Sequence, residues 1–125
     1  GVVSPRLLDA GKRLERTALA GVAAHAEALR FLEELGPEHF DEELHRRARA
    51  FLLGAAPADA ELTPLLAELY ALADEEEIGF ETTEQLLLQL RARRLQREID
   101  EADEERRVDL YQTLSRIRTR IREFA

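Results

Sequence analysis

The residues that could support chemistry are few, and the three imidazoles come first. They are His25, His39 and His45, and the last two lie six residues apart with three acidic residues, 41–43, between them. Imidazole and carboxylate groups bind metals, but a site needs a regular ligand spacing that this segment lacks. We therefore expect neither a metal nor another cofactor. We expect His45, beside Arg46, to lie exposed on a helix.

Other catalytic patterns are missing from the sequence. It contains no cysteine, a single lysine (Lys12), no glycine-rich phosphate loop and no HExxH motif. Acidic residues are abundant, yet they fall on predicted helix surfaces, whereas acid–base catalysis needs a pocket that positions the two groups. We therefore expect this chain not to be an enzyme, and we disfavour the alternative of a small hydrolase or metal enzyme.

Arginine supplies the most regular polar pattern. Every second residue from Arg116 to Arg122 is arginine, on both flanks of Ile117 and Ile121. The simplest interpretation is a set of ion pairs across to acidic residues of a neighbouring helix, Glu98 and Glu101 among them. A nucleic-acid-binding stripe is disfavoured, because aromatic residues that would stack on bases are absent there.

The element that carries these arginines is a predicted helical hairpin over residues 82–125. Each half has apolar residues at alternating spacings of four and three, which places one narrow apolar seam on each helix. Asp103 is the expected N-cap of the second helix, with Glu104 and Glu105 favourable in its first turn. The seam residues are Leu88, Ala92, Leu95, Ile99 and Ala102 in the first helix, and Leu110, Leu114, Ile117, Ile121 and Phe124 in the second.

Charge divides the chain in two. The net charge is −8, and residues 82–125 hold ten Arg against nine acids, so residues 1–81 carry −9. This balance disfavours direct nucleic-acid binding. The simplest interpretation is that the charges keep the two parts soluble and compatible with each other, and the alternative is a steered protein–protein contact. No apolar run is long enough for a membrane span, and no signal peptide is visible, so we expect a soluble, cytoplasmic protein that is monomeric alone.

We predict an all-α protein: an acidic helical bundle, residues 1–90, that shares its last helix with the hairpin, residues 91–125. Leu, Ala, Glu and Arg dominate the sequence, and strand-favouring residues are sparse. The leucine-rich stretch before Arg91 should lie in the bundle core, together with Phe40. The expected bundle helices are 12–24, 27–35, 42–53 and 64–74. The first follows a short lead-in begun by Ser4–Pro5, and the second follows a break at His25. Asp41 should cap the third, Thr63–Pro64 should begin the fourth, and Thr82 should cap the first hairpin arm.

Three segments in order resemble the C-terminal helicase-binding domain of bacterial DNA primase. They are Leu14-Glu15-Arg16-Thr17-Ala18-Leu19 leading to His25; Leu35-Gly36-Pro37-Glu38-His39-Phe40-Asp41 with Leu44-His45-Arg46; and Arg93-Arg94-Leu95-Gln96-Arg97-Glu98-Ile99 before a closing hairpin. Ala26 departs from the family pattern, which has Pro after the His.

The resemblance implies a helical subdomain followed by a hairpin that docks onto the N-terminal domains of the hexameric replicative helicase, at the replication fork. The primer-synthesising and zinc-binding domains of a primase would lie outside this chain. The helicase-binding residues that we expect are Tyr111, Arg118, Ile121, Arg122 and Phe124. Two alternatives are the helicase's own N-terminal domain, which has a similar P-E-x-F turn, and a structural coiled-coil or adaptor protein.

Overall fold

The computed structural model describes residues 5–124, and these are 78% helical with no strand, which confirms the all-α prediction. Six α-helices follow one another, with short 3₁₀ turns at residues 26–28 and 37–39. The helices are α1 (Pro5–Ala24), α2 (Leu29–Leu32), α3 (Glu43–Leu52), α4 (Leu62–Glu75), α5 (Phe80–Glu101) and α6 (Glu104–Arg122).

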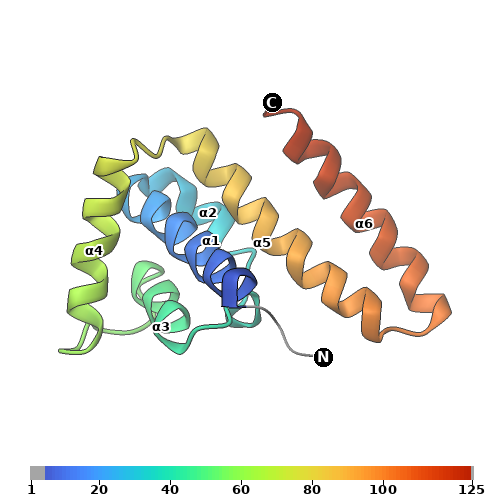
Figure 1. Cartoon of the computed structure of the whole chain (residues 1–125), viewed down its shortest axis with the longest axis horizontal. Coiled ribbons are helices and arrows are strands. Elements are labelled where there is room, and N and C mark those ends of the chain that lie inside the picture. Colours follow the sequence, from blue (N-terminus) through green and yellow to red (C-terminus); the bar gives the residue numbers. More distant parts are fainter. Residues whose placement is uncertain (1–4, 125) are drawn as a thin grey trace.

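Four long helices lie in the order α4, α1, α5, α6 across the molecule (Figure 1). Helix α1 contacts α4 on one side and α5 on the other, while α3 packs beneath α1 and α4. Helix α5 runs past the end of the bundle, and α6 returns along it as its antiparallel partner. Helix α6 has extensive contacts with α5 alone, so α5 belongs to both the bundle and the hairpin.

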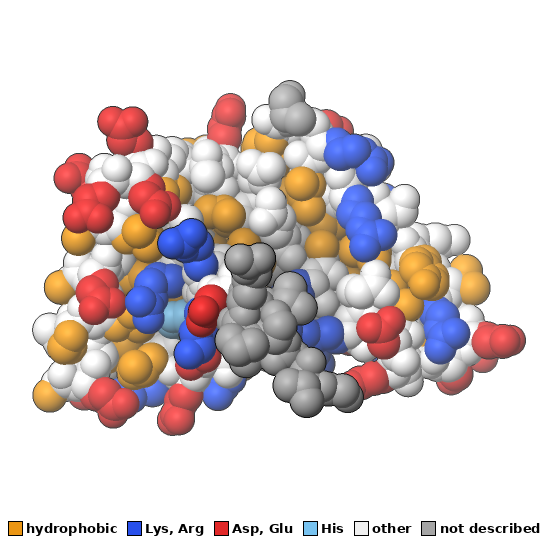
Figure 2. Space-filling view, viewed as in Figure 1, with side chains coloured by type: hydrophobic (Ala, Val, Ile, Leu, Met, Phe, Trp, Pro, Cys, Tyr) orange, Lys and Arg blue, Asp and Glu red, His pale blue; other side chains and the backbone are white. Residues whose placement is uncertain are grey.

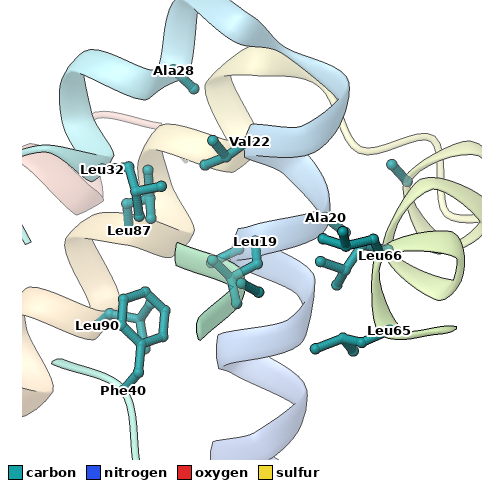
Figure 3. Packing of buried hydrophobic residues seen from close by; sticks show 14 of the residues in the cluster. Leu19, Ala20, Val22, Ala28, Leu32, Phe40, Leu65, Leu66, Leu87 and Leu90 are labelled. Atoms are coloured by element: carbon teal, nitrogen blue, oxygen red, sulfur yellow. The ribbon is translucent and has the colours of Figure 1, made fainter. Parts of the chain in front are cut away.

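The bundle core is built from leucine, alanine and one aromatic side chain. Phe40 lies beside Leu90 of α5, and Ala20 of α1 lies close to Leu66 of α4 (Figure 3). Phe40 is 1% exposed, which confirms it as a core residue. Burying one such large side chain contributes about 1.5–3 kcal/mol to folding, so this cluster is the main source of the bundle's stability.

A second, smaller apolar cluster holds the hairpin together. Its buried members are Leu95 and Ile99 of α5 with Leu114 and Ile117 of α6, all part of the predicted seams. The Asp103 side chain accepts a hydrogen bond from the Arg106 backbone N–H at 2.9 Å, which confirms it as the N-cap of α6. The predicted hairpin is therefore present, with its turn where the sequence placed it.

The first two helices of the bundle differ from the predictions in their boundaries. Gly11 does not interrupt the first helix, because one glycine costs only about 1 kcal/mol against alanine and strong helix formers surround it. The break at His25 is confirmed, but the predicted helix over 27–35 is reduced to a 3₁₀ turn and the single turn α2. Ser4 lies outside the described residues.

Three predicted N-caps are wrong. The N-cap of α3 is Glu42 and not Asp41; the backbone N–H groups of Asp41 and Glu42, just before the helix, donate to the carboxylate of Glu15 from α1. Helix α4 begins two residues before Pro64. The Leu62 backbone N–H donates to the Asp59 side chain at 2.8 Å, so Asp59 takes the place that was expected for Thr63.

Helix α5 also begins earlier than predicted. Its N-cap is Gly79, whose backbone is extended, so the helix begins at Phe80, two residues before Thr82. Helix α4 packs on one side only, and Tyr70 is 54% exposed.

Candidate protein-docking surface

The outer side of α6 brings three of the five predicted contact residues together. Tyr111, Arg118 and Arg122 recur at spacings of seven and four, so they align along one exposed stripe of the helix. Tyr111 is 50% exposed, and both arginines are exposed. A tyrosine beside arginines is the composition of energetically important residues at protein interfaces.

The other two predicted residues lie elsewhere. Ile121 is half-buried and packs against the hairpin seam, so its main role is to hold α6 on α5. Phe124 follows the end of α6, half-buried, with the Arg120 guanidinium 4.6 Å from its ring centre. That cation–π contact, and not closure of the seam, is what engages the Phe124 ring.

The sequence interpretation missed one member of this surface, Val108. It is 57% exposed, the highest value of the three large hydrophobic residues that are exposed in the described chain. Val108 lies three residues before Tyr111 and so extends the same stripe toward the start of α6. The signal was present in the sequence, as an apolar residue two positions before the seam residue Leu110.

The ion pairs of the hairpin differ from those expected. Arg120 pairs with Glu84 of α5 at 3.1 Å and with Glu123 at 2.8 Å. Glu98 is engaged by Arg94 on its own helix at 3.2 Å, and Glu101 forms no ion pair with a described residue. Arg118 donates to the Gln96 side chain at 3.3 Å, and Arg122 to Thr119 at 3.2 Å, so both charges lack a carboxylate partner among the described residues.

A buried polar network fastens the hairpin arm to the bundle. Glu15 of α1 is 1% exposed, and its carboxylate accepts from Arg93 of α5 at 2.8 Å. Next to it, Arg97 donates two hydrogen bonds to Asp41, at 2.7 and 2.9 Å. Arg93 also donates to the His39 carbonyl at 2.9 Å. The contacts extend along α5 beyond Leu90, where hydrophobic packing against the bundle ends.

His45 belongs to this network and corrects a prediction. It was expected to be exposed, but it is 2% exposed and its Nδ1 lies 3.0 Å from a Glu15 oxygen. The prediction was wrong because a histidine next to two arginines gives no local sign of a carboxylate from α1 lying over it. Both side chains are almost fully buried, so the pair joins α1 to α3 in the interior.

The electrostatics of the network follow from burial and hydrogen bonding. Burial raises the pKa of Glu15, but donors from His45, Arg93 and two backbone amides outweigh it and hold the pKa below its ordinary value of 4.5. The Arg97 hydrogen bonds hold the pKa of Asp41 below 3.8. Both carboxylates are therefore ionised near neutral pH, as the arginines require.

An open groove lies on the surface of the bundle. An open groove of about 930 Å³ lies between α1, α4 and α5, with Leu14, Leu72 and Leu86 among its lining residues. Its charged rim includes Lys12 and Arg16, which pair with Glu42 and Glu68.

Among the described residues, no three His, Cys, Asp or Glu side chains are grouped to hold a metal ion. None of the described helices is long and apolar enough to span a membrane.

Charge is distributed as the sequence predicted. Figure 2 shows Asp and Glu side chains around the α4 end of the visible face, and Lys and Arg side chains spaced along α6 with hydrophobic ones between them. No basic residue occurs between Arg49 and Arg91, a stretch that includes all of α4.

Comparison with known proteins gave no match: no family model, no curated protein and no solved structure is significantly similar to this chain.

Proposed function

We propose that this chain is the protein-binding module of a bacterial DNA primase, which docks onto the N-terminal domains of the replicative DNA helicase and couples primer synthesis to unwinding. The resemblance rests on three ordered sequence segments. In the structure these segments meet at one place, since Glu15 comes from the first, Asp41 and His45 from the second, and Arg93 and Arg97 from the third. The observation that carries the proposal is that all three motifs contribute side chains to this one network.

The geometry supports docking through the hairpin. Helix α6 is held by α5 alone, which leaves its outer side open along its length. The open side combines Tyr111 and Val108 with Arg118 and Arg122, which have no carboxylate partner in the described part of the chain, and so offers both apolar area and positive charge to a partner. The module has no catalytic role of its own in this proposal.

A binding assay with a bacterial replicative helicase hexamer tests the proposal. The intact chain should be retained by the immobilised helicase at moderate salt, whereas Tyr111→Ala and Arg118→Glu should each weaken binding at least about tenfold. Deleting residues 121–125 should also weaken it, with little loss of helical circular dichroism. Arg116→Glu is the matched control, because Arg116 is exposed on the opposite flank of α6. Absence of binding by the intact chain would refute the proposal.

A further inference from the structure

The exposed stripe of α6 contains charges that no neighbour compensates, and they are segregated along the helix. The stripe is formed by residues at spacings of four and three, all exposed: Glu104, Val108, Tyr111, Ser115, Arg118 and Arg122. Glu104 at its beginning forms no ion pair with a described residue, nor do Arg118 and Arg122 at its end. One end of the stripe is therefore acidic, the other basic, and the centre apolar and polar.

Such an arrangement is complementary to itself. If a second copy of α6 lies antiparallel on the stripe, with the two-fold axis near residue 113, Glu104 faces Arg122 of the other copy. Val108 then meets the aliphatic part of Arg118, and Tyr111 meets Ser115. Because a two-fold axis repeats every pair, each of these three contacts occurs twice. Together they extend along about 27 Å of the helix.

The helix dipole alone does not account for the stripe. It favours acids in the first turn and bases in the last, which explains Glu104 and Arg122 taken singly. It gives no reason for Val108 and Tyr111, at 57% and 50% exposure, to stand between them on the same side.

We infer that two copies of this chain associate through their α6 stripes, in an antiparallel arrangement about a two-fold axis. The contact is one helix against one helix, below the roughly 1,200 Å² of a standard interface, so the dissociation constant should be on the order of 0.1 mM. The inference is independent of the proposed function. Because Tyr111, Arg118 and Arg122 occur in both surfaces, a partner bound there would displace the second copy.

Charge exchange gives a sharp test in the purified full chain. In a dimer of the Glu104→Arg variant, the new arginine faces Arg122 at two places. In a dimer of the Arg122→Glu variant, the new glutamate faces Glu104 at two places. Each variant should associate at least about tenfold more weakly than the unmodified chain, because like charges then face each other. An equimolar mixture of the two variants should associate again, since both facing pairs of residues 104 and 122 across such a mixed dimer are of opposite charge.

Sedimentation equilibrium from about 10 μM to about 1 mM measures these constants. Asp109→Arg and Arg116→Glu are matched controls, with the same charge changes at exposed positions on the opposite side of α6, and they should associate like the unmodified chain. Circular dichroism of each single variant reports fraying of α6, and recovery in the mixture shows that fraying is not the cause of the loss.

Four results would overturn the inference. They are an unmodified chain that stays monomeric to about 1 mM, single variants that associate normally, a mixture that fails to recover, and control variants that weaken association as strongly as the stripe variants.

Discussion

At the scale of single residues, Glu15 does more than any other side chain to join the elements. Its carboxylate accepts from the backbone amides of Asp41 and Glu42, just before α3, and receives hydrogen bonds from His45 and Arg93. The segment that leads into α3 is thus fixed to α1, and a guanidinium that is largely removed from water finds its counter-charge. Residues 14–19 are the first segment of the primase-like pattern, and this network gives a physical reason for an acid in it.

We predict that Glu15→Gln lowers the free energy of unfolding by about 3 kcal/mol, because it removes the nearest carboxylate of the largely buried Arg93 and leaves that charge only Asp41, at 3.7 Å. The measurement is the urea midpoint followed by circular dichroism. Glu68→Gln is the control, since Glu68 forms a solvent-exposed pair with Arg16 at 3.6 Å, and its loss should cost less than about 1 kcal/mol. Equal effects of the two substitutions would contradict a structural role for the network.

Two glycines of α1 provide a second residue-scale prediction. A Cβ on Gly21 would overlap the Thr83 hydroxyl and lie 2.9 Å from the Thr83 Cβ, because α1 and α5 approach closely there. A Cβ on Gly11 would lie 3.4 Å from the Arg93 guanidinium, an ordinary contact. Gly21→Ala should therefore destabilise the protein by about 1–3 kcal/mol, whereas Gly11→Ala should stabilise it by up to about 1 kcal/mol through helix propensity.

Thermal unfolding of the two alanine variants checks this contrast. Thr83→Ser keeps the hydroxyl, which donates to the Gly79 carbonyl at 2.8 Å, and removes only a methyl group. Thr83→Ala removes the hydroxyl that a Gly21 Cβ would overlap, so combining it with Gly21→Ala should recover part of the stability and Thr83→Ser should recover less. Gly21→Ala being neutral would show that the two helices separate at little cost.

At the scale of elements, α6 depends on one neighbour. Its buried residues, Leu114 and Ile117, contact the α5 seam, and α6 has no other extensive contact. An isolated helix of 19 residues is marginal in water, so its helical state requires this seam. The division into residues 1–90 and 91–125 becomes testable here, since α6 should unfold before the bundle does.

We predict that Leu114→Ala, which removes a side chain 1% exposed, weakens packing in the hairpin by about 2–5 kcal/mol and exposes α6 amides to hydrogen exchange. Amides of α1 and of the Leu87–Leu90 part of α5 should keep their protection. Ser115→Ala, at the neighbouring exposed position, should change neither set. A parallel loss of protection in α1 would mean that the bundle and the hairpin unfold as one unit.

The elements also show what the sequence could and could not predict. The spacing of Leu95, Ile99, Leu114 and Ile117 was sufficient for the hairpin, because adjacent helices in sequence need only their own periodicity to find each other. The Glu15–His45 pair was not predictable, because the two residues lie thirty positions apart and neither has a local signal.

At the scale of the whole molecule, stability should depend on pH through three groups whose pKa values folding lowers. Burial lowers the pKa of His39 from 6.5, and hydrogen bonding leaves those of Glu15 and Asp41 below 4.5 and 3.8. In each case the unfolded chain takes up the proton at a higher pH than the folded chain does. The stability that each contributes is present above its ordinary pKa and is lost as the pH falls toward the folded value.

We therefore predict two losses on acidification: a small one beginning near pH 6.5, from His39, and a larger one below about pH 4.5, from the carboxylates. The larger loss should also loosen the hairpin arm, since protonated Glu15 and Asp41 no longer compensate Arg93 and Arg97. Urea unfolding at about pH 7.5, 5.5 and 3.5 measures both losses. The variant Glu15→Gln should be less stable at neutral pH but should lose less on acidification, and the two curves should converge at low pH. Parallel curves for the variant and the unmodified chain would show that Glu15 is not the group whose protonation unfolds the protein.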